Sequence, residues 1–309
     1  MNAKVQSIGG CRVCGSQNTS YLCVTHNEHS KTETLSHYSC NECGSVFIGS
    51  DIDHEELGVA YSTVDSKKYF KEIEVENRKK MTTAIAHLRD LVAKDESIID
   101  IGAGNGLFVE LLHEAGFENL SAHEIKGSDL SKVGKIANHI FEDFDYSTIP
   151  SNSFGAATLL DVVEHVIEPR YLINMCARIL KNDGVIYFHT PVVTRTDRLM
   201  HFLQGVPILK KAGTIWQRGR TSIFHLENYT ARSLELLLTE AGFRDIKIEI
   251  ANELSWPVTR YMRTDLLEKQ GLPAFLAPVF TPFLYPLLAT NLFNANKAIV
   301  CARKAAKAA

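Results

Sequence analysis

The chain has 309 residues, 45% hydrophobic and 22% charged, which is typical of a soluble globular protein long enough for about two domains. Its formal net charge of −3 argues against a protein that binds nucleic acid through its overall charge. The N-terminal segment lacks the apolar run of a secretion signal, and no stretch of about 18 residues is both apolar and free of proline, which argues against a membrane-spanning helix.

Four of the seven cysteines form two C-x-x-C-G units, a spacing that favours metal binding over disulfides in a protein without a secretion signal. The four are Cys11, Cys14, Cys40 and Cys43. Two such turns supply the tetrahedral ligands of Zn²⁺, and four thiolates leave no coordination position for chemistry, so we expect a structural ion. Alternating segments at 20–24 and 46–48 predict strands. Residues 1–50 are therefore predicted to form a zinc ribbon, with unligated core cysteines as the alternative.

A polar stretch with interspersed aromatic residues follows at 51–74, and we expect a connector that lies over the next domain. It leads into a stripe of apolar residues at helical spacing, formed by Met81, Ile85, Leu88 and Val92. The stripe predicts a helix that begins near Arg78.

The rest of the chain is organised around an apolar strand at 97–101 that ends in three alternate glycines. The glycines are Gly102, Gly104 and Gly106. Their spacing lets the backbone turn tightly into a helix that is expected to begin at Leu107 and end at Gly116, and lets a ligand lie against bare main chain. Dinucleotide-binding loops have a glycine where this chain has Leu107, and Asp100 stands two residues before the first glycine.

Three strands that each end near an acidic residue are expected next, at 119–125, 139–141 and 154–160. Glu124 ends the first, about 20 residues after the glycines, where a carboxylate of an open α/β sheet accepts from both ribose hydroxyls of a nucleotide. An ordinary polar strand end is the alternative. After the second strand, acids stand at 142, 143 and 145, and we select Asp143 to accept from an adenine amino group and Phe144 to offer a backbone N–H.

The remaining elements continue the alternation of helix and strand. A helix is expected to begin at Glu168-Pro169 and to end at 181–184, and Thr230 is the expected N-cap of a later helix. The remaining strands are expected at 185–189, 246–250 and, inserted antiparallel, 297–301. Together these segments predict a seven-stranded, doubly wound α/β domain over about 75–305.

These residues resemble the motifs of the class I S-adenosylmethionine-dependent methyltransferases. The pattern D-x-G-x-G-x-G at 100–106 resembles their motif I. A second signature of the family is resembled by the run from Ser153-Phe154-Gly155 through Leu160-Asp161-Val162-Val163-Glu164-His165, followed by 180–184 and Thr190-Pro191. The family usually has an aspartate where this chain has Gly155. The preceding pair of cysteine turns is similar to that of some members of the small-molecule and saccharide branch.

The resemblance implies a Rossmann-like methyltransferase domain that binds S-adenosylmethionine across the carboxyl ends of its first strands. The residues implied for cofactor binding are Asp100, Gly102, Ala103, Gly104, Asn105, Gly106, Glu124, Ile125, Asp143, Phe144 and Asp161. If the acceptor is a hydroxyl, a base helps remove its proton, and the candidates are His165, His189 and His225. For each of them a hydrogen-bonded structural histidine is the alternative.

Two segments depart from the core pattern. Residues 192–229 carry six Lys or Arg side chains between 195 and 220 against one acid, Asp197, and we expect an acceptor lid able to hold a phosphate, or else a solvated basic loop. Residues 253–293 are apolar but broken by prolines, and we expect a cover on the substrate side or against a membrane rather than a spanning helix. Packing on the sheet edge or on a second subunit, in a homodimer, is the alternative.

The predicted layout is a ribbon at 1–50, a connector at 51–74 and a methyltransferase domain at 75–309. The expected acceptor is a small molecule, a sugar, nucleotide-sugar or lipid-linked saccharide, methylated in the cytoplasm or at the inner face of its membrane. One alternative is an RNA base methyltransferase, but the ribbon holds few basic side chains for tracking phosphates: Lys4, Arg12 and Lys31. A non-catalytic cofactor-binding scaffold is the other, and the intact glycine turn argues against it.

Overall fold

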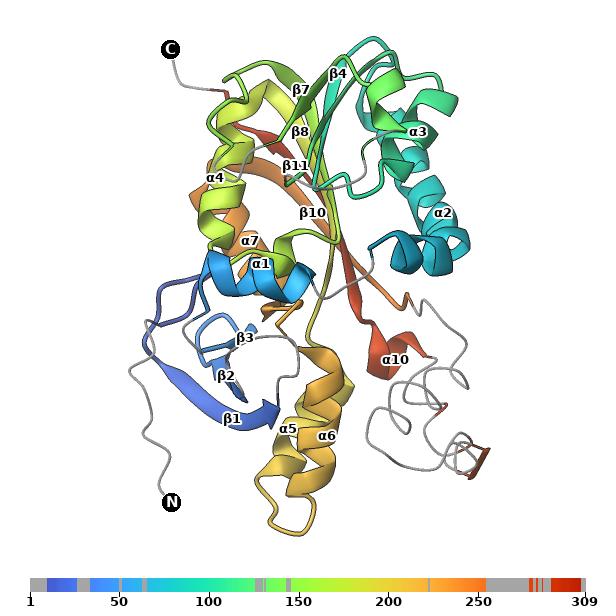
Figure 1. Ribbon diagram of the computed structural model, residues 1–309. Coiled ribbons are helices and arrows are strands. Elements are labelled where there is room, and N and C mark those ends of the chain that lie inside the picture. The colour runs from blue at the N-terminus through green and yellow to red at the C-terminus, as the bar shows by residue number, and fades with distance from the viewer. Residues whose placement is uncertain are drawn as a thin grey trace.

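The computed structural model contains two β-sheets with helices around them (Figure 1). The residues it describes are 10–26, 34–49, 52–62, 66–125, 130, 132–142, 146–221, 223–253, 278, 279, 282, 285 and 290–306. The sequence predictions for Asp143 and Phe144, and most of those for 253–293, fall outside this set. Within it, no helix is both long enough and apolar enough to cross a membrane.

The larger sheet has seven strands in the spatial order β10-β11-β8-β7-β4-β5-β6. Their bounds are β4 Ser97–Ile101, β5 Asn119–His123, β6 His139–Phe141, β7 Phe154–Leu160, β8 Leu180–Pro191, β10 Phe243–Ala251 and β11 Lys297–Lys304. Neighbours from β6 to β8 are parallel, and β11 runs antiparallel between β8 and β10, which confirms the predicted fold class. The strand order reverses beside β4, so a ligand site is expected at the carboxyl ends there.

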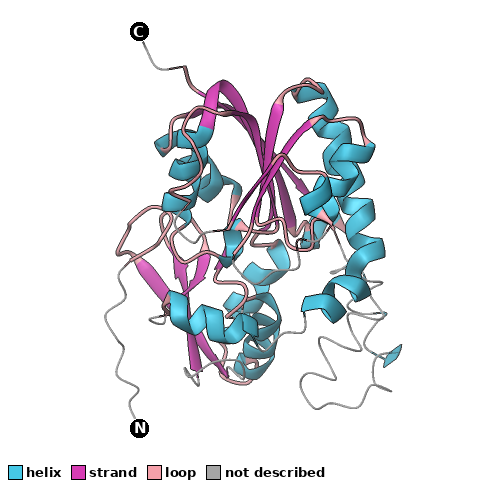
Figure 2. Cartoon of the chain, turned by 45° about the horizontal axis from the view of Figure 1, so that its top comes forward, coloured by secondary structure: helices cyan, strands magenta, loops and turns pink. Residues whose placement is uncertain are grey.

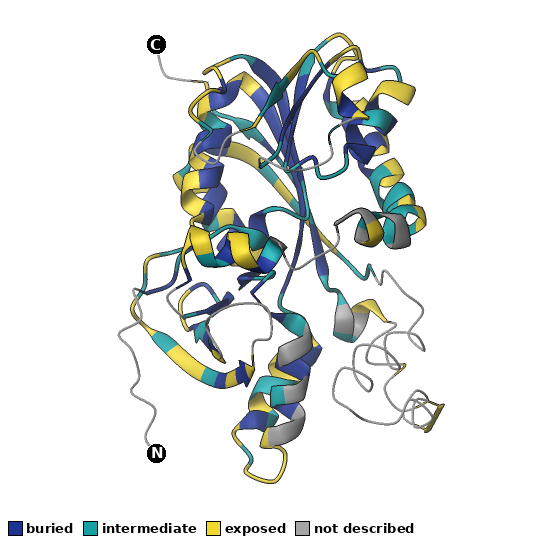
Figure 3. Ribbon diagram, in the orientation of Figure 1, coloured by how far each residue is buried: buried dark blue, intermediate teal, exposed yellow. Residues whose placement is uncertain are grey.

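Helices cover both faces of this sheet (Figure 2). The main ones are α2 (Ser66–Leu91), α3 (Leu107–Glu114), α4 (Pro169–Ile179) and α7 (Ala231–Glu240). Successive residues of β4 explain the two layers, because Ile98 belongs to the core shared with α2 and α3, whereas Ile99 belongs to the core shared with α4 and α7. The central strands are buried on both faces as a result (Figure 3).

The smaller sheet has four antiparallel strands in the order β1-β2-β3-β9. Their bounds are β1 Thr19–His26, β2 Thr34–Cys40, β3 Val46–Ile48 and β9 Glu227–Asn228. The first three strands lie in the predicted ribbon, whereas β9 comes from a point much later in the chain. The ribbon therefore shares its sheet with the C-terminal end of the predicted lid.

The predicted lid contains a helical hairpin beside β1, formed by α5 (Arg195–Gln204) and α6 (Lys210–Arg220) (Figure 1). We call these two helices and their connection the lid hairpin. The shorter elements are α1 (His54–Ser62), η1 (Val133–Lys135), η2 (Val163–His165) and α10 (Asn291–Asn294). Of these, η2 directly follows β7 and carries one of the predicted bases.

Two element boundaries differ from the sequence prediction. The segment 51–74 contains α1 and the first turns of α2, which begins at Ser66 rather than near Arg78. Those early turns are rich in Lys and Glu, which favour helix without forming an apolar stripe, so the stripe alone placed the start too late. Likewise α4 ends at Ile179, before 181–184, because the next residue, Leu180, already has an extended backbone with ψ of 144° and begins β8.

Candidate functional site

The three alternate glycines form the turn that leaves β4. All have positive φ, with values of 70° at Gly102, 58° at Gly104 and 80° at Gly106. A Cβ on Gly106 would lie 2.0 Å from Cγ2 of Val133, so no larger residue fits there without a shift. The N–H groups of Gly102 and Ala103 donate to the carbonyl of His123 at 2.9 and 3.0 Å. The turn thus lies at the carboxyl ends of β4 and β5.

Glu124, predicted to bind a ribose, follows β5 and bonds to this turn. Its Oε2 accepts from the N–H of Gly104 at 2.6 Å, and its Oε1 accepts from the N–H of Ile125 at 2.7 Å. A carboxylate oxygen accepts more than one hydrogen bond, so Glu124 keeps acceptor capacity for two hydroxyls. Of the other predicted cofactor residues, Asn105 accepts from the N–H of Leu107 at 3.3 Å at the start of α3.

Asp100 is buried within the sheet, with 3% of its surface exposed. Its Oδ1 accepts from Oγ1 of Thr158 on the neighbouring strand at 2.7 Å. Burial raises the pKa of the Asp100 carboxyl to about 7, and the nearby charge of Glu124 adds to the rise. The ionised form of this carboxyl is the better acceptor for an ammonium group.

Asp161 ends β7 with a left-handed φ of 58°, a conformation that non-glycine residues adopt rarely. Its side chain forms an ion pair with Lys297, at the start of β11, and its N–H donates to the carbonyl of His189 at 3.2 Å. Burial lowers the pKa of Lys297, and the charge of Lys80 lowers it further. Asp161 therefore links the ends of three strands at the edge of the predicted cofactor site.

His165 and His225, two of the three predicted bases, lie side by side. Their ring centroids are 4.8 Å apart. His165 is assigned as donating from Nδ1 to the carbonyl of Phe224, which leaves Nε2 as its basic nitrogen. Burial lowers the pKa of His165 to about 4 and that of His225 to about 3, so both rings are neutral at pH 7. A neutral imidazole is the form that takes up a proton, and the same lowered pKa makes each ring a weaker base than an ordinary histidine.

Glu164, which the sequence analysis did not select, completes this pair. It is 1% exposed; its Oε2 accepts from Oγ1 of Thr190 at 3.0 Å, and its Oε1 has no hydrogen-bond partner within the described part of the chain. Potential ligand atoms of Glu164, His165 and His225 lie within 4.8 Å of one another, a donor set able to hold a proton or a metal ion. Burial raises the pKa of Glu164 to about 8.

His189, the third predicted base, belongs to a different network. Its Nε2 lies 2.8 Å from the hydroxyl of Tyr187, which lies 3.0 Å from Nδ1 of His87 on α2. Burial lowers the pKa of His189 to about 4, with smaller contributions from the charges of Lys80 and His87. The structure thus brings two of the three histidines together and gives the third its own partners.

Four polar residues that complete these networks were missed from the sequence: Tyr61, His87, Glu164 and Tyr187. The hydroxyl of Tyr61 lies 3.1 Å from Nδ1 of His165, although the two residues are 104 positions apart. His87 and Tyr187 are 100 positions apart. No local pattern marks such pairs. For Glu164 the only sequence signal was its place in the motif at 160–165, because its unusual burial becomes visible only in the structure.

The four predicted metal ligands converge. The Sγ atoms of Cys11 and Cys43 are 3.6 Å apart, those of Cys14 and Cys40 are 3.5 Å apart, and all four lie within 4.8 Å of one another. In each unit the glycine N–H donates to the carbonyl of the first cysteine, at 2.8 and 2.9 Å. Tetrahedral Zn²⁺ with Zn–S bonds of about 2.3 Å separates its sulfurs by about 3.8 Å, so the cluster fits such an ion.

Comparisons with known proteins agree with this architecture. A family profile described as "Methyltransferase domain" matches residues 74–248. The ubiquinone biosynthesis O-methyltransferase of Stutzerimonas stutzeri is 27% identical over 158 residues, which are 46% of this chain and 64% of that protein. The enzyme of the same name from Idiomarina loihiensis is 32% identical over 108 residues, 31% of this chain and 42% of that protein. The chain thus spans about half the length of these curated relatives.

Among solved structures, a complex of the Haloferax volcanii Trm112 methyltransferase activator with a methyltransferase contains a similar chain. The TM-score is 0.53 at 15% identity, and the match covers 78% of this chain and 95% of that one. Likeness at this level of identity shows the fold alone.

Proposed function

The chain belongs to the methyltransferase domain family, and we propose that it transfers a methyl group from S-adenosylmethionine to a hydroxyl of a small molecule. The observation that carries the proposal is the pairing of two features at adjacent strand ends. A glycine turn bonded to Glu124 follows β4, and the neutral pair His165 and His225 lies just beyond β7. The first suits a nucleoside cofactor, and the second suits removal of a proton.

The residues on the cofactor side fit S-adenosylmethionine, which supplies an electrophilic methyl group on a sulfonium sulfur. Glu124 would accept from the ribose hydroxyls, and Asp100 would hold the amino end of the methionine. The glycines of 102–106 let the cofactor pass close to the main chain. Asp143 and Phe144 remain our candidates for the adenine.

On the acceptor side, we assign the proton to His165 or His225. The bond from His165 Nδ1 to the carbonyl of Phe224 holds the tautomer in which Nε2 accepts. A carboxyl group at Glu164, once ionised, would stabilise the imidazolium that forms. His189 stays a third candidate, because its bond to Tyr187 offers a route for the proton toward His87.

For the acceptor itself, we propose a sugar, a nucleotide-sugar or a lipid-linked saccharide. The outer face of α5 supports the lipid-linked member of this class, because Arg195, Arg198, Leu199 and Phe202 recur there at helical spacing and are all exposed. Residues 198–220 contain no acid. Such a face suits peripheral contact with an anionic membrane.

Vesicle flotation tests the membrane contact. Protein should float with anionic vesicles and much less with zwitterionic ones, and Phe202→Ser should reduce the floated fraction. Tyr171→Ser, at an exposed aromatic residue on α4, is the matched control. Equal recovery with both lipids, or no effect of Phe202→Ser, would contradict the membrane contact.

An RNA acceptor has less support. In the described part of the ribbon, residues 10–26 and 34–49, Arg12 is the one Lys or Arg, and its guanidinium donates to the carbonyl of Ile48 at 2.7 Å. A ribbon surface with so little positive charge is a poor match for a phosphate backbone.

Calorimetry on the purified protein tests the cofactor. S-adenosylmethionine and its demethylated product should bind, and nicotinamide dinucleotides should not. Incubation of the protein with labelled S-adenosylmethionine and a fractionated cell extract should then identify the compound that gains the methyl group. Tight binding of a nicotinamide cofactor, with no response to the methyl donor, would end the proposal.

A further inference from the structure

The ribbon is bonded through its metal-binding turns to the segment that follows the lid hairpin. Strand β9 pairs with β3, with Asn228 opposite Val46 and Glu227 opposite Phe47. The hydroxyl of Thr230 donates to the carbonyl of Cys43 at 2.6 Å, a direct contact with a predicted metal ligand. Strand β3 and the second cysteine turn therefore hold residues 227–230 in place.

The same segment is held on its other side by η2, next to the predicted acceptor site. The N–H of Leu226 donates to the carbonyl of Glu164 at 2.8 Å, and the hydroxyl of Tyr229 donates to the carbonyl of Val163 at 2.9 Å. His225 precedes Leu226 in this clamped stretch and lies against His165. The position of the His225 ring thus depends on contacts with both the ribbon and η2.

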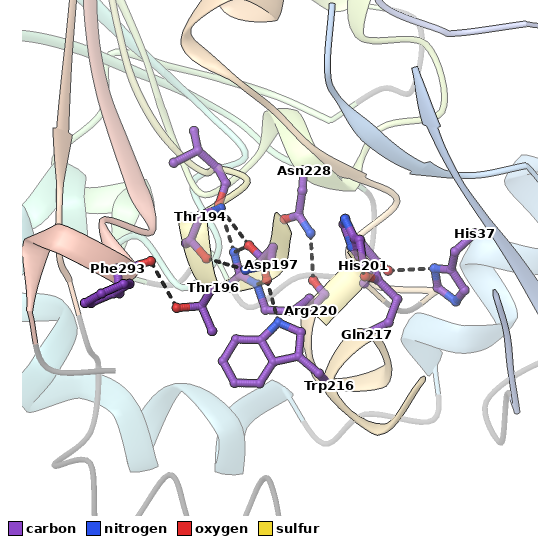
Figure 4. A network of polar contacts seen from close by, with 12 residues as sticks. His37, Thr194, Thr196, Asp197, His201, Trp216, Gln217, Arg220, Asn228 and Phe293 are labelled. Carbon is purple, nitrogen blue, oxygen red and sulfur yellow. Dashed lines mark hydrogen bonds and ion pairs between the residues drawn. The ribbon is translucent and has the colours of Figure 1, made fainter. Parts of the chain in front are cut away.

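A second connection joins the ribbon to the lid hairpin through His37, which is fully buried in β2. Its Nε2 lies 2.7 Å from Oγ1 of Thr25, and its Nδ1 lies 2.7 Å from Oγ1 of Thr221 at the end of α6. Gln217 donates to the same Thr221 hydroxyl at 2.7 Å and lies 2.8 Å from His201 of α5 (Figure 4). A continuous polar chain therefore runs from the ribbon sheet through both lid helices.

The lid hairpin has its own buried anchor beside this chain. Oδ1 of Asp197 accepts from Nε1 of Trp216 at 2.6 Å and from Nε of Arg220 at 2.9 Å (Figure 4). Asn228 of β9 donates to the carbonyl of Arg220 at 3.2 Å. The indole of Trp216 is thus a reporter for the packing of the lid hairpin, which Asn228 ties to the ribbon sheet.

We propose that the metal-bound ribbon is a wall of the acceptor site: it positions His225 and the lid hairpin and is not a separate binding module. His37 and Thr221 are positioning residues in this scheme. A ribbon of this size has a small core, so the metal at its four cysteines orders the strands that make these contacts. The assignment of the acceptor side rests on the proposed function, whereas the coupling of metal to His225 and the lid is a property of the chain alone.

Removal of the metal tests the coupling. In a Trp256→Phe background Trp216 is the remaining tryptophan. Its fluorescence emission should move to longer wavelength when a chelator removes the metal from the cysteines. Metal analysis checks that the metal has been removed. The imidazole NMR signal of His225, assigned with His225→Gln, should shift, while that of His139, exposed on the far edge strand β6, should not. S-adenosylmethionine binding should stay unchanged. Complete metal loss with unmoved Trp216 and His225 signals would overturn the proposal.

A single hydroxyl tests the path without disturbing the cysteines. Thr221→Val keeps the shape of the side chain but removes the oxygen that joins His37 to Gln217, and Thr214→Val, on the exposed side of α6, is the matched control. Thr221→Val should retain metal and shift Trp216 emission, and chelation should then move that emission less than in the parent. A full response to chelation in Thr221→Val would show that the path does not pass through this residue.

The outcomes separate this proposal from the proposed function. Failure of the unmodified protein to bind S-adenosylmethionine would contradict the methyltransferase assignment, while the response of Trp216 to metal would still decide the coupling. If metal removal abolished a cofactor binding present beforehand, the ribbon would support the whole fold, and the claim that it acts on the acceptor side would be wrong.

Discussion

The proposed cofactor side and the proposed acceptor side of the large sheet, called the cofactor side and the acceptor side below, are built in different ways. On the cofactor side, the turn at 102–106 and Glu124 come from one strand-turn-helix-strand unit, and the bond from Gly104 to Glu124 spans 20 positions. On the acceptor side, the bond from Tyr61 to His165 spans 104 positions, and His225 lies two residues before β9, the late strand of the ribbon sheet. Local backbone rules therefore set the first side, and packing between distant segments sets the second.

This difference has a consequence for mutational sensitivity. Changes in the ribbon or in the lid hairpin should disturb the acceptor side and spare cofactor binding. Changes at the glycine turn and Glu124 should do the reverse. The four predictions below test that division, from the largest expected effect to the smallest.

The largest effect is expected from Cys40→Ser. Loss of one thiolate should release the metal, and loss of a structural metal belongs to the few changes that cost more than about 4 kcal/mol of stability. Metal analysis after gel filtration and thermal unfolding measure both. Cys23→Ser, at a buried cysteine of the same sheet outside the cluster, should retain the metal. Equal metal content in the two variants would place the ligands elsewhere.

Arg220→Met should have the next largest effect. Arg220 and Asp197 are 13% and 4% exposed, so the substitution would leave a carboxylate buried without its cation. Such a change lowers the free energy of unfolding by about 3 kcal/mol or more. Urea unfolding should report the loss, and Arg195→Met, at the exposed start of α5, should cost little. If Arg220→Met weakens cofactor binding as much as it weakens the fold, the two sides are not independent.

The sequence predicted most of the cofactor side because its geometry is local. Glycines at alternate positions after an apolar strand require the positive φ values found at Gly102 to Gly106, and period-two burial places Ile98 and Ile99 in opposite cores. The parallel order around β4 follows from alternating strands and helices. Even the antiparallel β11 was predicted, through resemblance to a known sheet.

The acceptor side was predicted only as a set of candidate histidines. Nothing near His165 in the sequence indicates that His225 lies beside it or that Tyr61 lies within 3.1 Å of it. The two residues of β9 are too few to give a periodic signal, so their pairing with the ribbon could not be foreseen. Glu164 belongs to the motif at 160–165, but its buried position depends on contacts with Thr190 and with Leu226, beside the ribbon sheet.

Glu124→Ala sharpens the comparison from the cofactor side. The substitution removes the carboxylate that accepts from the N–H of Gly104 and that is proposed to accept from the ribose. It should weaken S-adenosylmethionine binding by about 1–3 kcal/mol, the cost of leaving the partner of a charge-assisted hydrogen bond unmatched. Calorimetry measures this, with Glu118→Ala, exposed before β5, as the control. Trp216 emission should not move. A shift of that emission would show that the two sides communicate.

The smallest effect concerns pH and the acceptor side. The folded-state pKa of Glu164 is raised by burial from 4.5 to about 8, so the folded protein holds a proton there that the unfolded chain has released. The stability from this proton is fully present below pH 4.5 and is lost as pH rises through about 8. The buried histidines act oppositely: their lowered pKa values of about 4 and 3 cost stability only as pH falls below about 6.5.

Above pH 6.5 these histidines contribute little to the pH dependence of stability, so the window from pH 6.5 to 8 suits a comparison of wild-type protein with Glu164→Gln. The Gln side chain of Glu164→Gln has no proton to lose. As pH rises across this window, the free energy of unfolding of the wild-type protein should therefore fall by about 1 kcal/mol per pH unit more than that of the variant. Asp100 also has a raised pKa, but it is present in both proteins and cancels in the difference. Urea unfolding at several pH values measures the two slopes, with Glu168→Gln, at the exposed start of α4, as the control. Parallel slopes would mean that the Glu164 carboxylate is ionised in the folded protein. The cluster of Glu164, His165 and His225 would then carry a charge, contrary to the neutral state described above.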